Sequence, residues 1–344
     1  MKRIKLISVI ALCAAMSCTL AVASGCGEDY EYHYHQYTEK VAEEKYLASQ
    51  ATHSKSARYY YSCTCGDRGY ATFEYGLPEG HDFTDGKCSC GVLQPTEGLV
   101  YELNSEGTAY SVAGLGKVTE TDIVIADIYG DNLLPVTEIK HWAFRNCSQL
   151  TGVVIPDSVT EVAQESFYGC SGLTSVTVPS SVEHIGYNAF GGCDGLTSIT
   201  LPFVGSSTEY KNYNKFFGYI FGAPRYYDNG SYVPASLRTV ILSEGVTDID
   251  EDAFWSCKGL TDIKLPKSLK SIGRQAFAYC SALTRMEIPK SVTSIAEYAF
   301  DSCSSLTIYC EAESKPSGWD SKWTSNWLSG NDKITVVWGY VIYD

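Results

Sequence analysis

Apolar and polar residues alternate over short stretches in the second half of the chain, and each stretch ends in the same way. In residues 173–179 a leucine is followed by two β-branched residues that alternate with polar ones, and a proline comes last. Such alternation predicts a short strand with one buried face. The proline ends the strand because it has no N–H to donate to a neighbouring strand. The next segment carries Val182, Ile185 and Phe190, which we expect to point back into the core.

The same unit recurs with a constant length. A phenylalanine is followed three residues later by a cysteine and six residues later by a leucine, and this phrase occurs with Cys147, Cys170, Cys193, Cys257, Cys280 and Cys303. Successive cysteines are 23, 23, 64, 23 and 23 residues apart. A unit of this length cannot bury its own apolar face and must stack on its neighbours, so the period predicts a repeat solenoid. We expect mainly short parallel β-strands with irregular or short helical return arms over residues 98–344.

The longest step between these cysteines contains one further repeat with an insertion at about residues 203–236. The segment is rich in aromatic residues, and its central run, 216–221, is expected to replace the missing phenylalanine and cysteine in the core. Insertions in solenoids often map to a binding face. Exposed tyrosines favour recognition because they offer a large contact area at low entropy cost. Tyr226, Tyr227 and Tyr232 are therefore candidate binding residues.

Alternate positions of each predicted strand face outward, and they form the second candidate surface. Its early strands carry small, uncharged residues and its later strands carry charged ones. Thr177, Thr200 and Ile241 are the candidate binding positions on this surface, and a solvated sheet without a partner is the alternative.

Both ends of the solenoid depart from the repeat. Residues 98–118 alternate in the manner of a hairpin, which we expect to cap the first unit. From about residue 308 the period is lost, and four tryptophans follow as Trp319, Trp323, Trp327 and Trp338. Solenoids need atypical terminal units to cover the open core, so these tryptophans are interpreted as a cap.

The amino terminus has the pattern of an export signal. Three basic residues precede an uncharged apolar stretch, 6–23, and Ser24, Gly25 and Cys26 follow. This ending resembles the lipobox of bacterial lipoproteins, which implies removal of residues 1–25 and attachment of lipid to Cys26. The alternative is ordinary signal cleavage after Ala23 and secretion of the chain.

Net charge narrows the classes of partner. The chain has a formal net charge of −14 at pH 7, and the predicted mature form is more negative because the signal contains three basic residues. A negative surface of this size argues against nucleic acid as a partner. No apolar stretch after the signal reaches the roughly 20 residues of a membrane span, so membrane attachment is expected through a lipid anchor only.

Residues 26–97 have a different composition, rich in cysteine and histidine. Zn²⁺ commonly takes four nitrogen or sulfur ligands, and the candidate ligands are His35, His53, Cys63, Cys65, His81, Cys88 and Cys90. One allocation is a four-ligand site from His35 to Cys65 with an incomplete second site, and the other is a single site of the two Cys-x-Cys pairs. The alternative is disulfides between the two pairs, since an exported chain is oxidised readily. Either would hold together a module too small for a large core.

The cysteines of the repeats are interpreted differently. Each occupies one equivalent position on a turn, where cysteine acts as a small buried apolar residue. Disulfides between units would also require favourable Cβ directions. We therefore expect buried free thiols at these six positions.

The repeat itself resembles a known family. Leu260 to Pro266, Leu269 to Gly273 and Ala276 to Cys280 are similar to the BspA-like leucine-rich repeats of bacterial surface proteins. The resemblance implies a non-enzymatic protein of the cell surface that acts as an adhesion scaffold. Its implied partners are proteins or glycans on a host or neighbouring cell surface. The alternative is a structural cell-envelope protein without a specific ligand.

Overall fold

The computed structural model describes residues 40, 47–49, 57–62, 68–75, 83–88, 93–131, 133–207, 214–326 and 334–342. The chain divides into two compact units, Met1–His81 and Asp82–Asp344. This division precedes residue 97, where the change in composition placed the end of the cysteine- and histidine-rich segment. Within the described ranges, no helix has the length and apolar character needed to cross a membrane.

The first unit contains a small antiparallel sheet. Its strands are β1 (Leu47–Ser49), β2 (Ala57–Ser62) and β3 (Arg68–Tyr75), in the order β1-β2-β3. Tyr59 of β2 lies opposite Phe73 of β3.

The second unit begins with two hairpins. The first consists of β4 (Phe83–Thr84) and β5 (Lys87–Cys88), and the second of β6 (Val100–Leu103) and β7 (Tyr110–Gly114). The side-chain oxygen of Asn104 accepts the amides of Thr108 and Ala109 at 2.8 and 3.2 Å and so closes the second turn. The hairpin predicted for residues 98–118 is confirmed.

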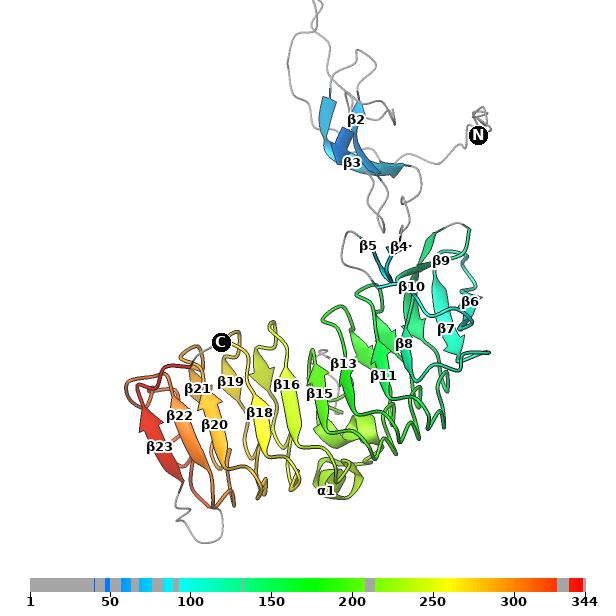
Figure 1. The fold of residues 1–344 in the computed structure, drawn as a ribbon. Helices are drawn as coiled ribbons and strands as arrows, with labels where there is room; N and C mark the ends of the chain where they lie inside the picture. Colours follow the sequence, from blue (N-terminus) through cyan, green and yellow to red (C-terminus); the bar gives the residue numbers. More distant parts are fainter. Residues whose placement is uncertain are drawn as a thin grey trace, which may run out of the picture. The chain divides into compact units, whose positions relative to one another are not determined.

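Short parallel strands then stack along the solenoid, and we call them the strand sheet (Figure 1). Its members are β8 (Asp122–Val124), β11 (Gly152–Val154), β13 (Ser175–Thr177), β15 (Ser198–Leu201), β16 (Thr239–Leu242), β18 (Asp262–Lys264), β20 (Arg285–Ile288), β22 (Thr307–Cys310) and β23 (Thr335–Trp338). Along each strand from β13 to β22, buried residues alternate with half-buried or exposed ones. The predicted fold class, a leucine-rich repeat solenoid, is confirmed.

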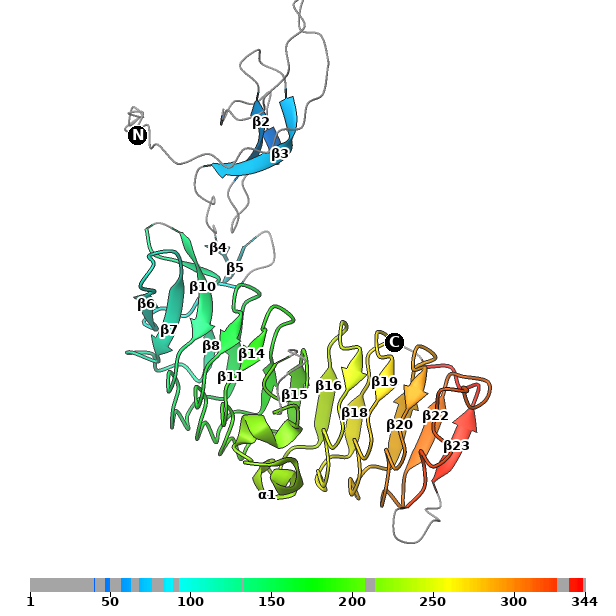
Figure 2. The ribbon, with the colours of Figure 1, turned by 180° about the vertical axis from the view of Figure 1, so that it is seen from behind.

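The return arms contribute a second set of strands, the arm sheet, seen from behind in Figure 2. Its first part has the order β14-β12-β10-β7-β6 and contains β10 (Leu134–Ile139), β12 (Glu161–Val162) and β14 (His184–Ile185), with β9 (Ile128–Tyr129) paired to β10. Its second part contains β17 (Asp248–Ile249), β19 (Ser271–Ile272) and β21 (Ser294–Ile295). The apolar core lies between the two sheets.

A column of phenylalanine rings fills the core behind the return arms. Phe144, Phe167 and Phe190 are fully buried and stack with centroids 5.2 and 5.4 Å apart. Phe254, Phe277 and Phe300 form a second stack with both distances at 5.4 Å. These spacings lie close to the distance between neighbouring strands, about 4.8 Å, so each repeat places its ring directly on the preceding one.

Two residues of each return arm adopt a left-handed backbone. They lie two residues before and two residues after the phenylalanine, and the non-glycine examples are Trp142, Asn146, Glu165, Asn188, Asp252, Ser256, Gln275, Tyr279, Tyr298 and Ser302. This conformation is unfavourable for most residues. Here it turns alternate amides toward the next repeat: the Phe254 amide donates to the Ala276 carbonyl at 2.7 Å, and the Ser256 amide to that of Ala278 at 2.7 Å.

The repeat cysteines are free thiols, as predicted, and all but half-buried Cys147 are buried. The Cys280 thiol donates to the carbonyl of Phe254 at 3.1 Å, and that of Cys303 to Phe277 at 3.1 Å. The thiol therefore satisfies a carbonyl of the preceding repeat as well as filling the corner. Burial raises the pKa of Cys193 to about 12.

The insertion closes the core as predicted and then leaves it. Ser207 forms an antiparallel bridge with His184, so the chain here does not continue the arm sheet in parallel. The short helix η2 (Phe217–Phe221) buries Phe217 against Phe254, with centroids 5.1 Å apart. After it come η3 (Tyr226–Asp228) and α1 (Asn229–Tyr232), and α1 lies at the edge of the stack beside β15 and β16 in both views (Figures 1 and 2).

The carboxyl end combines a cap with two further strands. Trp319 and Trp323 are buried, as predicted, and Trp323 packs edge-on against Phe300 at 5.9 Å. Trp338 is half-buried, and Trp327 lies outside the described residues. The sequence period ends near residue 308, yet β22 and β23 extend the sheet in register beyond it.

We expect Phe277→Ala to lower the free energy of unfolding by about 3–5 kcal/mol, because it removes a buried ring from the centre of a stack. The measurement is chemical denaturation followed by circular dichroism. Thr177→Ala, at an exposed strand position, is the control and should change stability by less than about 0.5 kcal/mol. Equal stability of the two variants would contradict a stabilising role for the stacked phenylalanine rings.

The buried thiols should be inert in the folded protein. Burial disfavours the reactive thiolate and raises the pKa of Cys193 and Cys310 to about 12. We expect an alkylating reagent at pH 8 to spare the buried repeat cysteines in native protein and to modify them in denaturant. Mass spectrometry of peptides checks this outcome, and rapid native labelling of Cys280 would contradict it.

Candidate functional site

The outward residues of the strand sheet form one continuous surface, which we call the sheet face. Thr177 of β13 lies in register with Thr200 of β15, Thr200 with Ile241 of β16, and Ile241 with Lys264 of β18. The three predicted positions are thus neighbours on adjacent strands. Thr177 is exposed, Thr200 is half-buried and Ile241 is 36% exposed. Together they give a flat stripe of β-branched side chains.

Toward the amino end the sheet face carries an apolar groove of about 560 Å³. Val124 of β8 and Val154 of β11 lie in register in its floor, and Leu93 forms part of its wall. Leu93 and Val154 are 40% and 43% exposed. We call this feature the valine groove.

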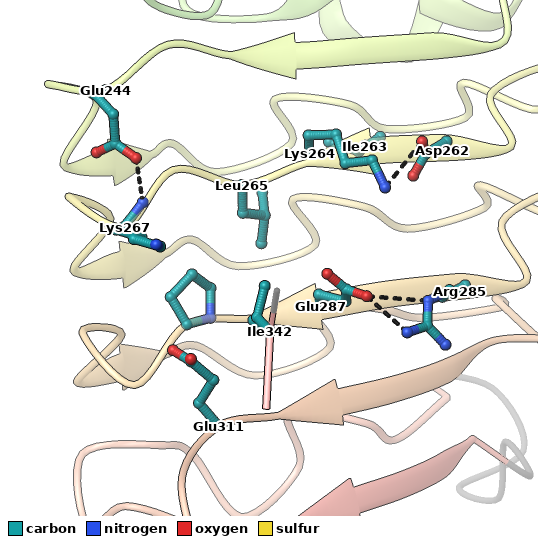
Figure 3. A pocket seen from close by; sticks show the side chains of 11 residues that line it. Glu244, Asp262, Ile263, Lys264, Leu265, Lys267, Arg285, Glu287, Glu311 and Ile342 are labelled. Atoms are coloured by element: carbon teal, nitrogen blue, oxygen red, sulfur yellow. Dashed lines mark hydrogen bonds and ion pairs between the residues drawn. The ribbon is translucent and has the colours of Figure 1, made fainter. Parts of the chain in front are cut away.

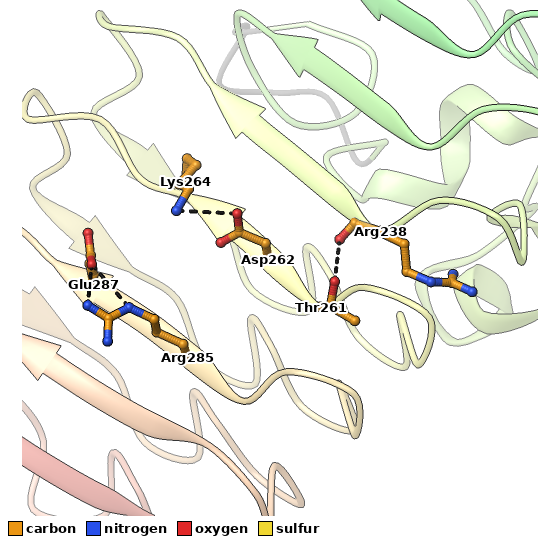
Figure 4. Close-up of polar contacts among 6 residues, drawn as sticks. All are labelled: Arg238, Thr261, Asp262, Lys264, Arg285 and Glu287. Carbon is orange, nitrogen blue, oxygen red and sulfur yellow. Dashed lines mark hydrogen bonds and ion pairs between the residues drawn. The ribbon is translucent and has the colours of Figure 1, made fainter. Parts of the chain in front are cut away.

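Toward the carboxyl end the sheet face is charged, and its charges pair with one another. Figure 3 shows residues that line a depression there, with Glu287 paired to Arg285 and Ile342 lying against the strands. The depression has a volume of about 390 Å³, and the Arg285–Glu287 pair is separated by 2.6 Å. Figure 4 shows the neighbouring pair of Lys264 and Asp262 at 3.3 Å. Such exposed pairs contribute little stability, typically below about 1 kcal/mol.

Arg285 is the most extensively contacted of these charges. Its guanidinium lies over the ring of Tyr309 at 3.9 Å and over that of Tyr340 at 5.2 Å, and it donates to the Tyr340 hydroxyl at 2.9 Å. The segment after β23 is fixed by Tyr340, whose amide donates to the Cys310 carbonyl at 2.9 Å. The carboxyl-terminal segment thus covers part of the charged surface.

The insertion presents the second candidate surface, the tyrosine cluster of Tyr226, Tyr227 and Tyr232. These side chains are 40%, 41% and 45% exposed. Tyr226 packs edge-on against Trp255 at 6.0 Å, and Arg225 lies over the Tyr227 ring at 4.4 Å. The rings of Tyr226 and Tyr227 lie 5.2 Å apart, and Tyr232 follows at the end of α1.

Two buried polar residues support this cluster. The side chain of Asn229 is fully buried; its oxygen accepts the Gly218 amide at 2.9 Å and its nitrogen donates to the Trp255 carbonyl at 3.1 Å. Asp252 is 8% exposed, and one of its carboxylate oxygens has no hydrogen-bond partner. Burial, reinforced by nearby Glu251, raises the pKa of Asp252 from 3.8 to about 6.

Most predicted lipid and metal positions lie outside the described residues: Cys26, His35, His53, Cys63, Cys65, His81 and Cys90. Cys88 is described and is buried in β5. Over the ranges that the structure describes, no group of three or more His, Cys, Asp or Glu could hold a metal ion.

Two features of the sheet face were not predicted from the sequence. Leu93 lies 31 residues from Val124 in sequence, in a segment whose composition gave no indication of contact with the repeats. Tyr340 reaches Arg285 only because the chain folds back after its last strand. The period of the repeat located each strand, but it carried no information on segments outside the period.

The repeat matches a described family. The pattern of the BspA type leucine rich repeat region matches six copies over residues 134–218 and 228–314, together half of the chain. The chain belongs to the BspA-type leucine-rich repeat family. Among curated proteins, none matches the chain.

Several solved structures are similar to this BspA-type repeat chain. A leucine rich cell surface protein from Faecalibacterium prausnitzii is 31% identical, with a TM-score of 0.41 over 66% of this chain and 56% of that one. A T. pallidum leucine rich repeat protein is 19% identical, with a TM-score of 0.37 over 55% and 89%. A leucine-rich repeat protein from Eubacterium ventriosum is 20% identical, with a TM-score of 0.39 over 64% and 49%. The chain thus spans about half the length of the first of these.

We expect Asp252→Asn to stabilise the protein at neutral pH. Because the folded-state pKa of about 6 lies above 3.8, the folded state binds more protons in this window, so stability falls as pH rises from about 4 to 6. The substitution should raise the free energy of unfolding at pH 7 by about 2 kcal/mol and flatten the profile between these values. Asparagine also suits the left-handed backbone, as Asn188 does at the equivalent position.

Denaturation midpoints from pH 4 to 8 give the measurement. Asp194→Asn, at an exposed carboxylate, is the matched control and should follow the parent profile. If the stability of Asp252→Asn fell with rising pH as steeply as that of the parent, Asp252 would not be the group responsible for this pH dependence.

Proposed function

We propose that this chain is a surface-anchored bacterial binding scaffold that holds a partner protein or glycoprotein through the tyrosine cluster and the adjoining solenoid surface. The observation that supports it is the exposure of Tyr226, Tyr227 and Tyr232, at 40–45%, on a short helical segment fixed from beneath by Asn229. Tyrosine combines an apolar ring with a hydroxyl, a combination enriched at interfaces.

Packing does not account for this exposure. Phe217, Ile220 and Phe221 already close the core at the insertion, with exposed fractions of 2% or less. The three tyrosines are therefore not needed to fill the space between the flanking repeats. Ring contacts of Tyr226 with Trp255 and of Tyr227 with Arg225 fix the positions of these two side chains while leaving area for a partner. Residues held in place before binding lose less entropy when a complex forms.

Location at the cell surface is part of the proposal. It rests on the export signal of residues 1–25 and the lipobox at Cys26, with secretion as the alternative. The F. prausnitzii protein to which this chain is similar is described as a cell surface protein. The competing function is a structural role in the envelope without a specific ligand.

The test uses purified residues 27–344 and a panel of immobilised mucin and extracellular-matrix glycoproteins, each also in deglycosylated form. We expect saturable binding to at least one glycoprotein. The affinity should fall by about tenfold or more when Tyr226, Tyr227 and Tyr232 are all changed to alanine. The melting temperature should change little because these rings lie outside the core. Retained binding after deglycosylation would assign recognition to the protein portion.

A matched control is the change of three exposed residues elsewhere, Thr160, Thr174 and Thr293, to alanine, which should leave binding intact. Two results would contradict the proposal. Absence of saturable binding across the panel would favour the structural role, and a large loss of stability in the tyrosine variant would assign the rings to packing.

A further inference from the structure

The valine groove has a wall that is fixed by hydrogen bonds. Leu93 forms a bridge with Lys87 of β5, and the Gln94 amide donates to the Gly86 carbonyl at 2.8 Å. The Thr96 amide donates to the Val124 carbonyl at 2.9 Å, and the Thr96 hydroxyl accepts the Val124 amide at 2.9 Å. The exposed leucine is therefore held beside half-buried Val124 of β8 and exposed Val154 of β11.

A carboxylate lies in this apolar setting. Asp122 is exposed, and its Oδ1 accepts the Thr151 hydroxyl at 2.9 Å. A Cβ atom built on Gly152 would lie only 2.4 Å from the same oxygen, so the missing side chain of the glycine makes the space that the carboxylate occupies. Within the part of the chain that the structure describes, Asp122 forms no salt bridge. The groove thus combines one held negative charge with exposed aliphatic side chains.

Charge is distributed unevenly along the solenoid. Residues 82–200, which include the whole groove, contain 15 Asp and Glu against four Lys and Arg. Residues 201–344 contain 16 Asp and Glu against 14 Lys and Arg, and the charged part of the sheet face lies there. A cationic partner is therefore attracted to the amino half of the solenoid, where few basic side chains compete with it.

We propose that the valine groove docks an extended cationic polypeptide segment in which a Lys or Arg lies two residues from an aliphatic residue. The basic side chain pairs with Asp122, while the aliphatic side chains contact Leu93, Val124 and Val154. Side chains two residues apart in an extended peptide point the same way, so both kinds can reach the sheet face, where Asp122 and Val124 lie two residues apart on β8. This inference rests on the proposed binding function and adds a second surface to it.

The lining distinguishes this occupant from others. Among the residues that the structure describes, none that lines the groove is aromatic, so they offer a sugar ring no platform on which to stack. The excess of carboxylates repels nucleic acid and anionic peptides. Gly152 and Ser175 beside the valines are small, so the backbone of a single extended strand can approach the sheet more closely there than a helix could.

The test measures fluorescence anisotropy of short labelled peptides with purified residues 27–344 at low ionic strength. In each probe every second residue is serine, and the residues between are alternately lysine and valine, alternately glutamate and valine, or all lysine; these are the Lys–Val, Glu–Val and Lys–Ser peptides. We expect the Lys–Val peptide to bind most tightly, with an affinity that falls as NaCl is raised. Asp122→Asn should weaken it by about tenfold, and Val154→Lys, which puts a like charge into the groove, by at least as much.

Asp194→Asn is the matched control, because it removes one exposed carboxylate from the same half of the solenoid. The Lys–Val peptide should bind this variant as tightly as the parent. Melting temperatures of all variants confirm folding, and the conservative Asp122→Asn retains an oxygen for the Thr151 hydroxyl.

Three outcomes would overturn the inference: no binding of the Lys–Val peptide, equal binding of the Glu–Val peptide, or equal effects of the Asp122 and Asp194 variants. The tyrosine variant described above should still bind the Lys–Val peptide. Failure of the groove would therefore leave glycoprotein capture by the tyrosine cluster intact, and failure of that capture would leave peptide binding intact.

Discussion

The hydrogen bonds between return arms are the interaction on which the rest of this solenoid depends. Alternate amides of each arm point along the solenoid axis and donate to the next repeat, as the Phe277 amide does to the Ala299 carbonyl at 2.8 Å. This arrangement requires a left-handed residue on each side of the phenylalanine, in most cases a residue other than glycine. The conformational cost, on the order of 1 kcal/mol per residue, is offset only when a neighbouring repeat accepts the bond. Stacking and backbone conformation therefore stabilise each other.

The sequence was sufficient to predict the parts of the fold that the period determines. A 23-residue repeat located the buried face of each strand, the phenylalanine column and the free thiols, because stacked units must place equivalent residues in equivalent positions. It also indicated that the run from 216 to 221 would close the core at the insertion, as Phe217 does, and it left the role of the nearby tyrosines open. It gave no sign of the left-handed residues, since Trp142, Glu165 and Gln275 share no chemical property that favours this conformation.

The two halves of the sheet face differ in how many of their outward side chains already form contacts with one another. At the carboxyl end Arg285 is enclosed by Glu287, Tyr309 and Tyr340, so its charge and its donors are already engaged. At the amino end Val154 and Leu93 remain exposed. They line the same groove because the segment before the repeats is hydrogen-bonded to β8. Segments outside the 23-residue repeat make contacts that depend on the folded chain, and a repeating sequence pattern does not predict such contacts.

The insertion has a mechanical consequence. It interrupts the arm sheet, because Ser207 meets β14 in an antiparallel bridge and the parallel arm strands resume only at β17. The strand sheet is uninterrupted there, with four residue pairs in register between β15 and β16. On the arm side η2 stands in place of a parallel strand: the Phe190 amide donates to the Ile220 carbonyl at 2.8 Å, and the Phe217 amide donates to the Ala253 carbonyl at 2.7 Å. The two blocks of repeats are thus joined by a regular ladder on one face and by irregular backbone bonds on the other, so a bending load should strain the arm side before the strand side.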